Sequence, residues 1–407
     1  MRVLYLHPAA AFGGASKSLI ELFGQLRTRG VTATVLVPAG SACVAFAQAG
    51  MEVRSVKGLS QFDNTRYGHY RRLRWIILLR ELFLLPFSLH GLWRLRQERF
   101  DLIHVNEVTL LPLGLLAKWL LGIPLVVHVR SLQRKPNSGW RSRMINGWLR
   151  RYADAVVAID HTVAGTLETG PRLHVVHNGL KVDISVPLPC DSGVERETSA
   201  QSPVRVGFLG VLIPLKGVYD LVEAMRILKQ RGVLIECLVA GDNVRELSGL
   251  RAWALRKLDF SHDVRAELED RIVRYGLQPH VKLLGFVDDV RALYPQLDIL
   301  CFPSHLDAAG RPVFEAAFYG IPSVVVVANP MPDAILHGVT GLAIPSPDPV
   351  LLADALQRLA EDADYRKTLG RQARDWANEN FAIDNSAASM QAIYQQLVHQ
   401  HDVKAAG

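Results

Sequence analysis

The sequence predicts an α/β protein built from two doubly wound domains, each with a parallel sheet. Short apolar runs of strand length alternate with longer helical patterns along most of the chain. Several of these runs are apolar throughout, which is typical of strands that helices cover on both faces. The 407 residues leave room for two domains, each large enough to bury its own core.

The first half of the chain contains one series of strands separated by helical patterns. The expected strands are Arg2–His7, Val31–Val37, Met51–Val56, Asp101–Val105, Leu125–Val129, Ala155–Ile159 and His174–His177. Such alternation predicts right-handed β-α-β units, so we assign residues 1–182 to an N-terminal domain.

The rhythm stops at residues 183–203, which are polar, contain proline and lack periodicity, as expected of an interdomain linker. A second series then begins and defines a C-terminal domain over residues 204–380. Its expected elements are the strand Val204–Leu209, the helix Gly217–Gln230, the strand Leu234–Ala240, a helical stretch Ser248–Tyr275, and the strands Val281–Leu284, Ile299–Phe302 and Ser323–Val327. The final residues are expected to be helical.

Composition separates the two halves by charge. Apolar residues make up 49% and charged residues 21%, which excludes disordered and fibrous classes. Residues 1–182 hold 24 Lys and Arg against 10 Asp and Glu, whereas the remainder holds 22 against 29. The four cysteines lie far apart without metal-ligand spacing, so we expect reduced thiols in a cytoplasmic protein, no disulfide framework and no zinc site.

The most hydrophobic stretch, residues 75–93, is interrupted by Arg80, Glu81 and Pro86, so we do not expect it to span a bilayer. Arginines flank it on both sides. We therefore expect the segment at about residues 66–99 to lie on an anionic membrane surface; the alternative is a helix that packs on the sheet with a solvated basic face.

A constellation at residues 303–322 carries the clearest chemistry. After an expected strand, Asp307 lies in a loop, Gly310 precedes a helix that opens near Pro312, and Glu315 lies one turn into it. Unpaired backbone N–H groups at Arg311–Val313 suit a diphosphate. Carboxylates pair well with hydroxyls, so a nucleotide sugar would place its hexose near Asp307 and its ribose near Glu315.

These residues resemble the signature of the retaining, metal-independent glycosyltransferases of family 4. The resemblance implies the GT-B fold, in which two Rossmann-like domains face each other across a cleft, and a C-terminal helix, here residues 381–407, that packs back on the N-terminal domain. Asp307 replaces the glutamate that is usual in the family. Lys216-Gly217 matches the loop that neutralises the donor diphosphate, but Val211 occupies its usual arginine position. The resemblance thus assigns catalytic roles to Lys216 and Asp307, with Lys216 helped by Arg311.

The resemblance also assigns residues of the N-terminal domain. Gly13 and Gly14 match a glycine turn that approaches the donor phosphate and the acceptor. His128, beside Arg130, falls near the place of a histidine that faces the donor sugar, and is taken as catalytic. Asn106 completes the expected acceptor side. The P-loop and dinucleotide motifs are absent.

The sequence therefore predicts a hexosyltransferase that uses a UDP- or GDP-sugar and a glycan or lipid-linked acceptor. We expect no cofactor, no metal and no nucleic-acid partner. Asp362-Ala363-Asp364 matches the Asp-X-Asp pattern by which another glycosyltransferase fold holds a metal, but it lies in a charged helical stretch and not after a strand. The expected location is cytoplasmic, on the cytoplasmic face of a membrane. The alternatives are a nucleotide-sugar 2-epimerase of the same fold and a catalytically weak nucleotide-sugar-binding protein.

Overall fold

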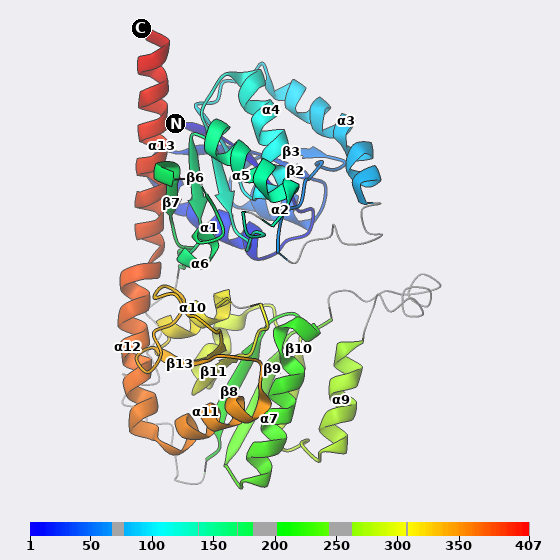
Figure 1. The fold of residues 1–407 in the computed structure, drawn as a ribbon, viewed down its shortest axis with the longest axis vertical. Helices are drawn as coiled ribbons and strands as arrows, with labels where there is room; N and C mark the ends of the chain where they lie inside the picture. Colours follow the sequence, from blue (N-terminus) through cyan, green and yellow to red (C-terminus); the bar gives the residue numbers. More distant parts are fainter. Residues whose placement is uncertain are drawn as a thin grey trace. The chain divides into compact units, whose positions relative to one another are not determined.

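The computed structural model describes residues 1–66, 77–136, 138–168, 170–181, 202–243, 263–306 and 308–406. The chain forms two compact units (Figure 1). The first comprises Met1–Lys181 and Phe381–Gly407, and the second comprises Val182–Asn380. The second unit is thus an insertion between two parts of the first.

The first unit contains a parallel sheet with the strand order β3-β2-β1-β4-β5-β6-β7. Its strands are β1 (Arg2–Leu6), β2 (Thr32–Pro38), β3 (Glu52–Val56), β4 (Leu102–Val105), β5 (Leu125–Val129), β6 (Ala155–Ala158) and β7 (Leu173–Val175). The order reverses between β1 and β4, which makes the sheet doubly wound.

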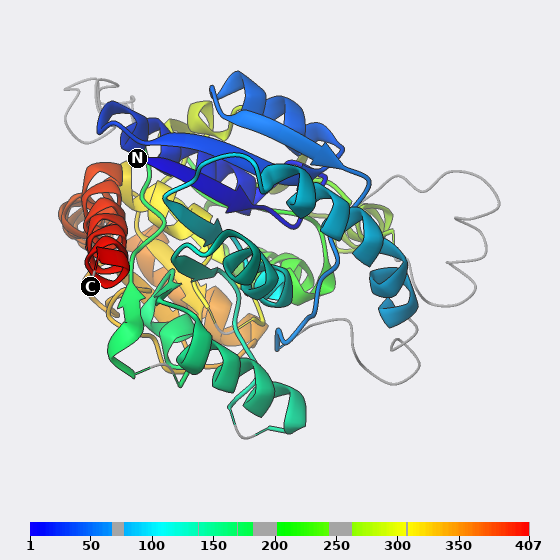
Figure 2. The same ribbon diagram turned by 90° about the horizontal axis from the view of Figure 1, so that it is seen from above.

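Helices cover both faces of this sheet, and Figure 2 shows α13 and α3 on opposite sides of it. One face carries α1 (Gly14–Thr28), α2 (Ser41–Gln48) and α13 (Ile383–Ala406). The other carries α3 (Ile77–Leu95), α4 (Leu111–Leu121), α5 (Trp140–Tyr152) and the short α6 (His161–Ala164).

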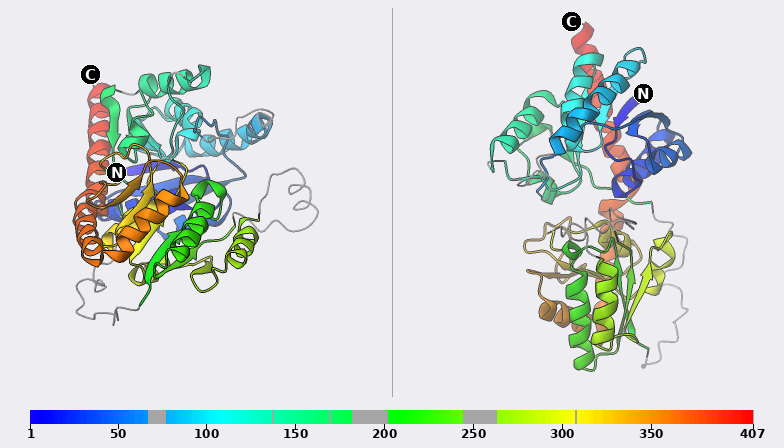
Figure 3. Two further views of the ribbon diagram at one scale, coloured as in Figure 1. Left: turned by 60° about the horizontal axis from the view of Figure 1, so that its bottom comes forward. Right: turned by 90° about the vertical axis from the view of Figure 1, so that its right-hand side faces the viewer.

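The second unit repeats this plan with the strand order β10-β9-β8-β11-β12-β13 (Figure 3). Its strands are β8 (Val204–Leu209), β9 (Ile235–Ala240), β10 (Val281–Gly285), β11 (Ile299–Phe302), β12 (Ser323–Val326) and β13 (Gly341–Ile344). The helices α7 (Val218–Gln230), α9 (Val264–Arg274), α11 (Pro349–Glu361) and α12 (Ala363–Phe381) contribute to the core on one face. On the other face lies α10 (Arg311–Phe318).

The predicted fold class is confirmed, and the predicted strands agree with the observed ones to within one or two residues. One strand was missed: β13 pairs in parallel with β12, with Gly341 opposite Ser323. Its four residues follow a glycine-bearing turn, so they carry too little periodicity to reveal a strand. Residues 183–201, nearly all of the expected linker, and residues 248–262 of the expected helical stretch lie outside the described residues.

The C-terminal helix α13 completes the core of the first unit. Its apolar side chains pack on the sheet face that also carries α1. Buried polar groups join it to the strands: the hydroxyls of Tyr394 and Tyr5 lie 3.2 Å apart, and the Tyr394 hydroxyl lies 2.5 Å from His104 Nδ1. Of the helices described, none combines the length and the hydropathy needed to span a bilayer.

Candidate functional site

Doubly wound sheets bind ligands beyond the carboxyl ends of their strands, where the strand order reverses. That point lies between β1 and β4 in the first unit and between β8 and β11 in the second. The predicted site residues follow these strands: Gly13 and Gly14 lie after β1, Asn106 after β4, Lys216 after β8 and Glu315 after β11. Each unit thus places its candidate residues at its own switch point.

In the second unit, the loop after β8 and the loop after β11 are locked together. The His305 amide donates to the Leu215 carbonyl over 2.9 Å. Gly217 has a left-handed φ of 70°, and a Cβ there would lie 1.8 Å from the Pro303 carbonyl oxygen. Only glycine permits both this conformation and this approach. The result is a fixed cradle around Lys216, which immediately precedes Gly217.

Lys216 is a partly buried cation at the end of the short helical turn Pro214–Lys216. Its Nζ lies 4.9 Å from the centroid of the Phe302 ring, a cation–π arrangement that directs the ammonium group. Burial lowers the pKa of Lys216. Over the described part of the chain no ion pair between Lys216 and a carboxylate is formed, so the ammonium group is suited to an anionic ligand.

At the start of α10, fewer backbone N–H groups are open to an anion than the sequence suggested. Gly310 is the N-cap of this helix, and Pro312, in its first turn, has no N–H group. The Val313 N–H donates to the Gly310 carbonyl over 2.9 Å. Pro312 thus has no amide to donate, and the Val313 amide bonds within the helix; the predicted contact of residues 311–313 with a diphosphate stays a prediction.

The Glu315 carboxylate is fixed by two neighbours. Its Oε1 accepts a hydrogen bond from Arg311 Nε over 2.7 Å, and its Oε2 accepts one from the Tyr294 hydroxyl over 2.6 Å. Tyr294 in turn stacks on Tyr319, with ring centroids 5.2 Å apart. Burial and the charge of Glu315 raise the pKa of Tyr294 well above its ordinary value, so this hydroxyl stays a donor. Glu315 is thus held in place by hydrogen bonds, and its side chain is only 12% exposed.

Two further features of this loop bear on the sequence prediction. Asp307 lies outside the described residues, so its predicted role stays a prediction. His305 Nε2 lies 2.5 Å from Asp220 Oδ2, an interaction that was not predicted from the sequence. This contact ties the loop to the first turn of α7. It had no signal in the sequence, because 85 residues separate the two side chains.

In the first unit, the residues at the switch point form a hydrogen-bonded cluster. His7, which follows β1, lies with Nε2 3.0 Å from Ser16 Oγ and Nδ1 2.8 Å from Asn106 Nδ2. Asn106 Oδ1 accepts from Arg130 Nε over 3.0 Å, and Arg130 Nη1 donates to Asn178 Oδ1 over 2.5 Å. His7 was not predicted, although a polar residue directly after the first strand was a usable signal.

Electrostatics keep parts of this cluster neutral. Burial, reinforced by the charge of Arg130, lowers the pKa of His7 to about 3. Burial also raises the pKa of Glu107, next in sequence to Asn106, to about 7. Its Oε1 accepts a hydrogen bond from the Val108 amide over 2.9 Å. The glycine turn next to this cluster is not crowded: a Cβ added to Gly13 or Gly14 would meet nothing within 4 Å.

His128 lies inside β5, not at its end, because that strand continues to Val129. The side chain is 2% exposed, and Nδ1 lies 3.3 Å from His104 Nε2. Burial together with the charge of Arg130 lowers its pKa well below the ordinary value. Arg130, just beyond the strand, is the more accessible of the two predicted residues, and its Nη2 contacts His128 Nδ1 over 3.3 Å.

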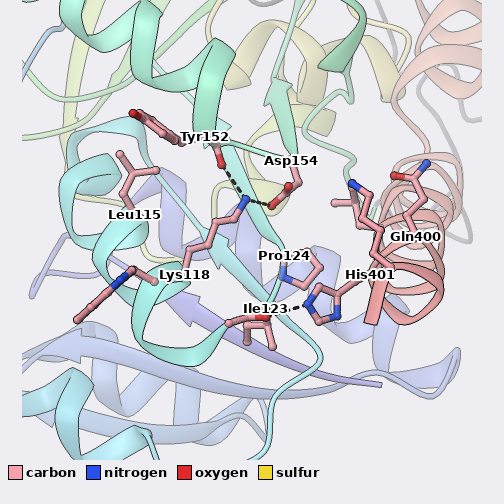
Figure 4. Close-up of a pocket in the computed structure, with 12 residues that line it drawn as sticks. Leu115, Lys118, Ile123, Pro124, Tyr152, Asp154, Gln400 and His401 are labelled. Carbon is pink, nitrogen blue, oxygen red and sulfur yellow. Dashed lines mark hydrogen bonds and ion pairs between the residues drawn. The ribbon is translucent and has the colours of Figure 1, made fainter. Parts of the chain in front are cut away.

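A separate pocket of about 570 Å³ lies at the end of the first sheet where β5 and β6 begin (Figure 4). Ile123 and Pro124 border it just before β5, and Asp154 just before β6. Lys118 Nζ donates to Asp154 Oδ2 over 2.6 Å and to the Tyr152 carbonyl over 2.9 Å. Because this pocket lies where strands begin, it is not part of the switch-point site.

Two family models match the chain in succession. The model for Glycosyltransferase Family 4 matches residues 12–184, and the model for Glycosyl transferases group 1 matches residues 194–376. The two matches meet near the end of the first part of the first unit.

Curated relatives are distant in sequence. A D-inositol 3-phosphate glycosyltransferase from Salinispora tropica is 28% identical over 74% of this chain, which spans 65% of the length of that relative. The capsular polysaccharide biosynthesis glycosyltransferase CapM from Staphylococcus aureus is 21% identical over 49% of this chain and 48% of its own length. The lipopolysaccharide core biosynthesis mannosyltransferase LpcC from Rhizobium leguminosarum bv. viciae is 24% identical over 76% of this chain and 83% of its own length.

Solved structures share the fold over nearly the full length. HepE from Anabaena, crystallised with UDP, has a TM-score of 0.74 at 22% identity and covers 98% of this chain and 100% of its own. Sucrose-phosphate synthase from Thermosynechococcus elongatus has a TM-score of 0.70 at 17% identity, over 98% of this chain and 99% of its own. At these identities the likeness establishes the two-domain GT-B fold.

Proposed function

The chain belongs to the group 1 glycosyltransferases, and we propose that it transfers a hexose from a UDP- or GDP-sugar to an acceptor hydroxyl with retention of anomeric configuration. The observation that carries this proposal is that Lys216 and Glu315 both follow strands at the β8/β11 switch point. One is a cation without an ion-pair partner among the described residues, and the other is a carboxylate held for hydrogen bonding.

In the proposed complex, the second unit holds the donor. Ribose hydroxyls replace Arg311 at Glu315 Oε1, while Tyr294 keeps the carboxylate in position through Oε2. The Arg311 guanidinium is proposed to exchange its hydrogen bond with Glu315 for one with the diphosphate, since a guanidinium is a bidentate donor suited to phosphate oxygens. Lys216 neutralises the diphosphate, and Asp307 is proposed to bind the hexose. No bound metal ion is required, because these two cations supply the positive charge.

We propose that transfer takes place on one face of the sugar. The bond from the anomeric carbon to the diphosphate oxygen breaks, the acceptor oxygen bonds to the same face, and the acceptor proton passes to the departing diphosphate. Lys216 stabilises the charge that builds on this leaving group. Arg130, which follows β5 of the first unit, is proposed to orient the acceptor, and the buried Asn106 is proposed to hold Arg130 through its Oδ1. His128 is proposed to act through Arg130, because its ring is buried.

The acceptor is proposed to be a glycan or a lipid-linked glycan at the cytoplasmic face of a membrane. The basic balance of residues 1–182 supports an anionic acceptor or surface. HepE has been crystallised with UDP and with UDP-glucose, which supports a UDP-sugar as donor. The names of CapM and LpcC refer to polysaccharide and lipopolysaccharide synthesis, which supports a glycan acceptor.

The first experiment is a thermal-shift screen of the full chain against UDP- and GDP-sugars. A donor that binds the folded state raises the melting temperature. The selected donor is then incubated with glycan and lipid-linked acceptors, and the anomeric configuration of the product is read by NMR. An inverted product contradicts retention. Conversion of UDP-N-acetylglucosamine without an acceptor identifies a 2-epimerase, and binding without any turnover identifies a binding protein.

A further inference from the structure

The helix α3 presents its most apolar face to solvent. Its buried side contains Glu81, Ser88 and Gly91 among its leucines. Its outward side carries large apolar side chains that are more than half exposed: Leu79 (65%), Leu82 (63%), Phe83 (60%) and Trp93 (52%). These positions, with the exposed Leu89 between them, recur at helical spacing and form one stripe. A helix that served only to cover the sheet would have the opposite orientation.

Polar contacts on the buried side fix this orientation. Glu81 Oε2 accepts a hydrogen bond from the Gln61 amide over 2.7 Å. Ser88 Oγ accepts one from the Ser60 amide over 2.8 Å. Gly91 lies against Val56 and allows the helix to approach the sheet closely. Rotating the helix to bury its apolar stripe would break both hydrogen bonds and leave the Glu81 carboxylate without them.

Basic groups border the apolar stripe. Lys57 Nζ lies 5.2 Å from the Phe83 ring centroid and 5.0 Å from that of Phe87, and the Arg96 guanidinium lies 4.0 Å from the Trp93 ring centroid. Arg80 and Arg94 are exposed on the helix itself. The acidic residues of this segment do not offset these charges, because Glu81 is buried and Glu98 forms ion pairs with Arg2 and Arg54.

We infer that α3 is the surface on which the protein docks to an anionic lipid leaflet, with the stripe from Leu79 to Trp93 inserted among the acyl chains. Tryptophan and phenylalanine on an apolar face with arginine at its border suit the boundary between headgroups and acyl chains. The inference deepens the membrane-surface part of the proposed function and rests on it. A partner without negative charge would match the apolar face but would leave the basic border without a counterpart.

The same segment connects this surface to the acceptor side of the first unit. Gln61, whose amide holds Glu81, also donates through Nε2 to the Pro8 carbonyl over 3.2 Å. Pro8 follows His7 and precedes the glycine turn at Gly13 and Gly14. The buried side of α3 is thus linked through Gln61 to the segment proposed to meet the acceptor, which agrees with an acceptor carried by a lipid.

The test is flotation of the full chain with vesicles of phosphatidylcholine alone or mixed with phosphatidylglycerol. We expect the wild type to float with the mixed vesicles, less so at high salt, and to stay unbound with phosphatidylcholine alone. The triple variant L82S/F83S/W93S should lose binding at least tenfold. The matched control L234S/V273S/F286S, which removes exposed apolar side chains from the second unit, should bind as the wild type does.

Two measurements keep this inference separate from the proposed function. UDP binding by calorimetry should be the same in the wild type and in the α3 variant, which also shows that the variant is folded. If the wild type does not bind UDP, the donor proposal is overturned and the docking inference is not affected. Equal flotation of the wild type and the α3 variant, or light scattering that shows a wild-type dimer converted to a monomer by the variant, would overturn the docking inference.

Discussion

Arg311 Nε donates a hydrogen bond to Glu315 Oε1 over 2.7 Å, one turn apart on α10. The carboxylate proposed to bind ribose is therefore already paired in the structure without a ligand. Tyr294 holds the second oxygen of the same carboxylate. Donor binding then exchanges one partner of Glu315 and leaves the other in place, so the carboxylate stays oriented throughout.

Replacing Glu315 tests this exchange. E315Q keeps the shape of the side chain but removes the charge that strengthens its hydrogen bonds, and such bonds contribute about 1.5–3 kcal/mol. We expect UDP to bind about 10- to 100-fold more weakly in calorimetry. The control is E223Q, which removes a carboxylate from a similar intrahelical pair with Arg226. Unchanged UDP affinity in E315Q would exclude Glu315 from the donor site.

Lys216 is expected to act mainly on turnover. Removing a positioned charge that stabilises a leaving group lowers kcat by about 10²–10³-fold. We expect K216A to show this loss with an unchanged circular dichroism spectrum, and K216R to keep part of the rate. K367A, at an exposed position of α12, should keep the full rate. Full turnover by K216A would refute the assignment.

Gly217 offers a test of the cradle through stability. An alanine there would be strained by the left-handed φ, at about 1–2 kcal/mol, and would also overlap the Pro303 carbonyl. Gly232 provides the control, because its φ of 75° is similar but a Cβ would meet nothing within 4 Å. We expect G217A to lower the free energy of unfolding clearly more than G232A in denaturant titrations. Equal losses would show that the two loops separate easily.

The buried histidines make stability depend on pH. Burial lowers the pKa of His7 and of His104 to about 3, and that of His128 well below its ordinary value. The unfolded chain takes up these protons at about pH 6.5, so the free energy of unfolding should fall as the pH drops from there toward 3. Glu107, with its pKa raised to about 7, acts in the opposite direction, but three imidazoles outweigh one carboxyl.

Denaturant titrations at several pH values measure this slope. H104Q, which keeps hydrogen-bonding groups near Tyr394 but does not titrate, should reduce the loss of stability on acidification relative to the wild type. A wild-type free energy of unfolding that stays constant or increases below about pH 6.5 would contradict the assignment of neutral, buried imidazoles.

Local patterns made most of the fold and part of the site predictable. Strands covered on both faces are apolar runs, and Lys216 and Glu315 lie within a few residues of turns that the sequence marks. The orientation of His128 was accessible in principle. Val126 and His128 alternate with Val127 and Val129, so they share a face of β5, and Val126 lies in the core beneath α13.

The contacts that were not predicted join distant segments. Tyr294 reaches Glu315 across 21 residues, His305 reaches Asp220 across 85, and Tyr394 reaches His104 across 290. No periodicity or spacing encodes such pairs, because they depend on how the strands are ordered in the sheet. Asp307 and most of the expected linker fall outside the described residues, so their predicted roles remain predictions.

The return of the chain to the first unit at Phe381 imposes an order on its biosynthesis. The second unit is continuous in sequence, so the ribosome translates all of it before α13. Until then the sheet face around Tyr5 and Val126 stays uncovered, since Met390 and Tyr394 are translated after the whole second unit. The nascent protein therefore passes through a stage in which all strands of the first sheet have been translated but one face of that sheet lacks the α13 side chains that complete its core. That stage is where chaperones would be needed most.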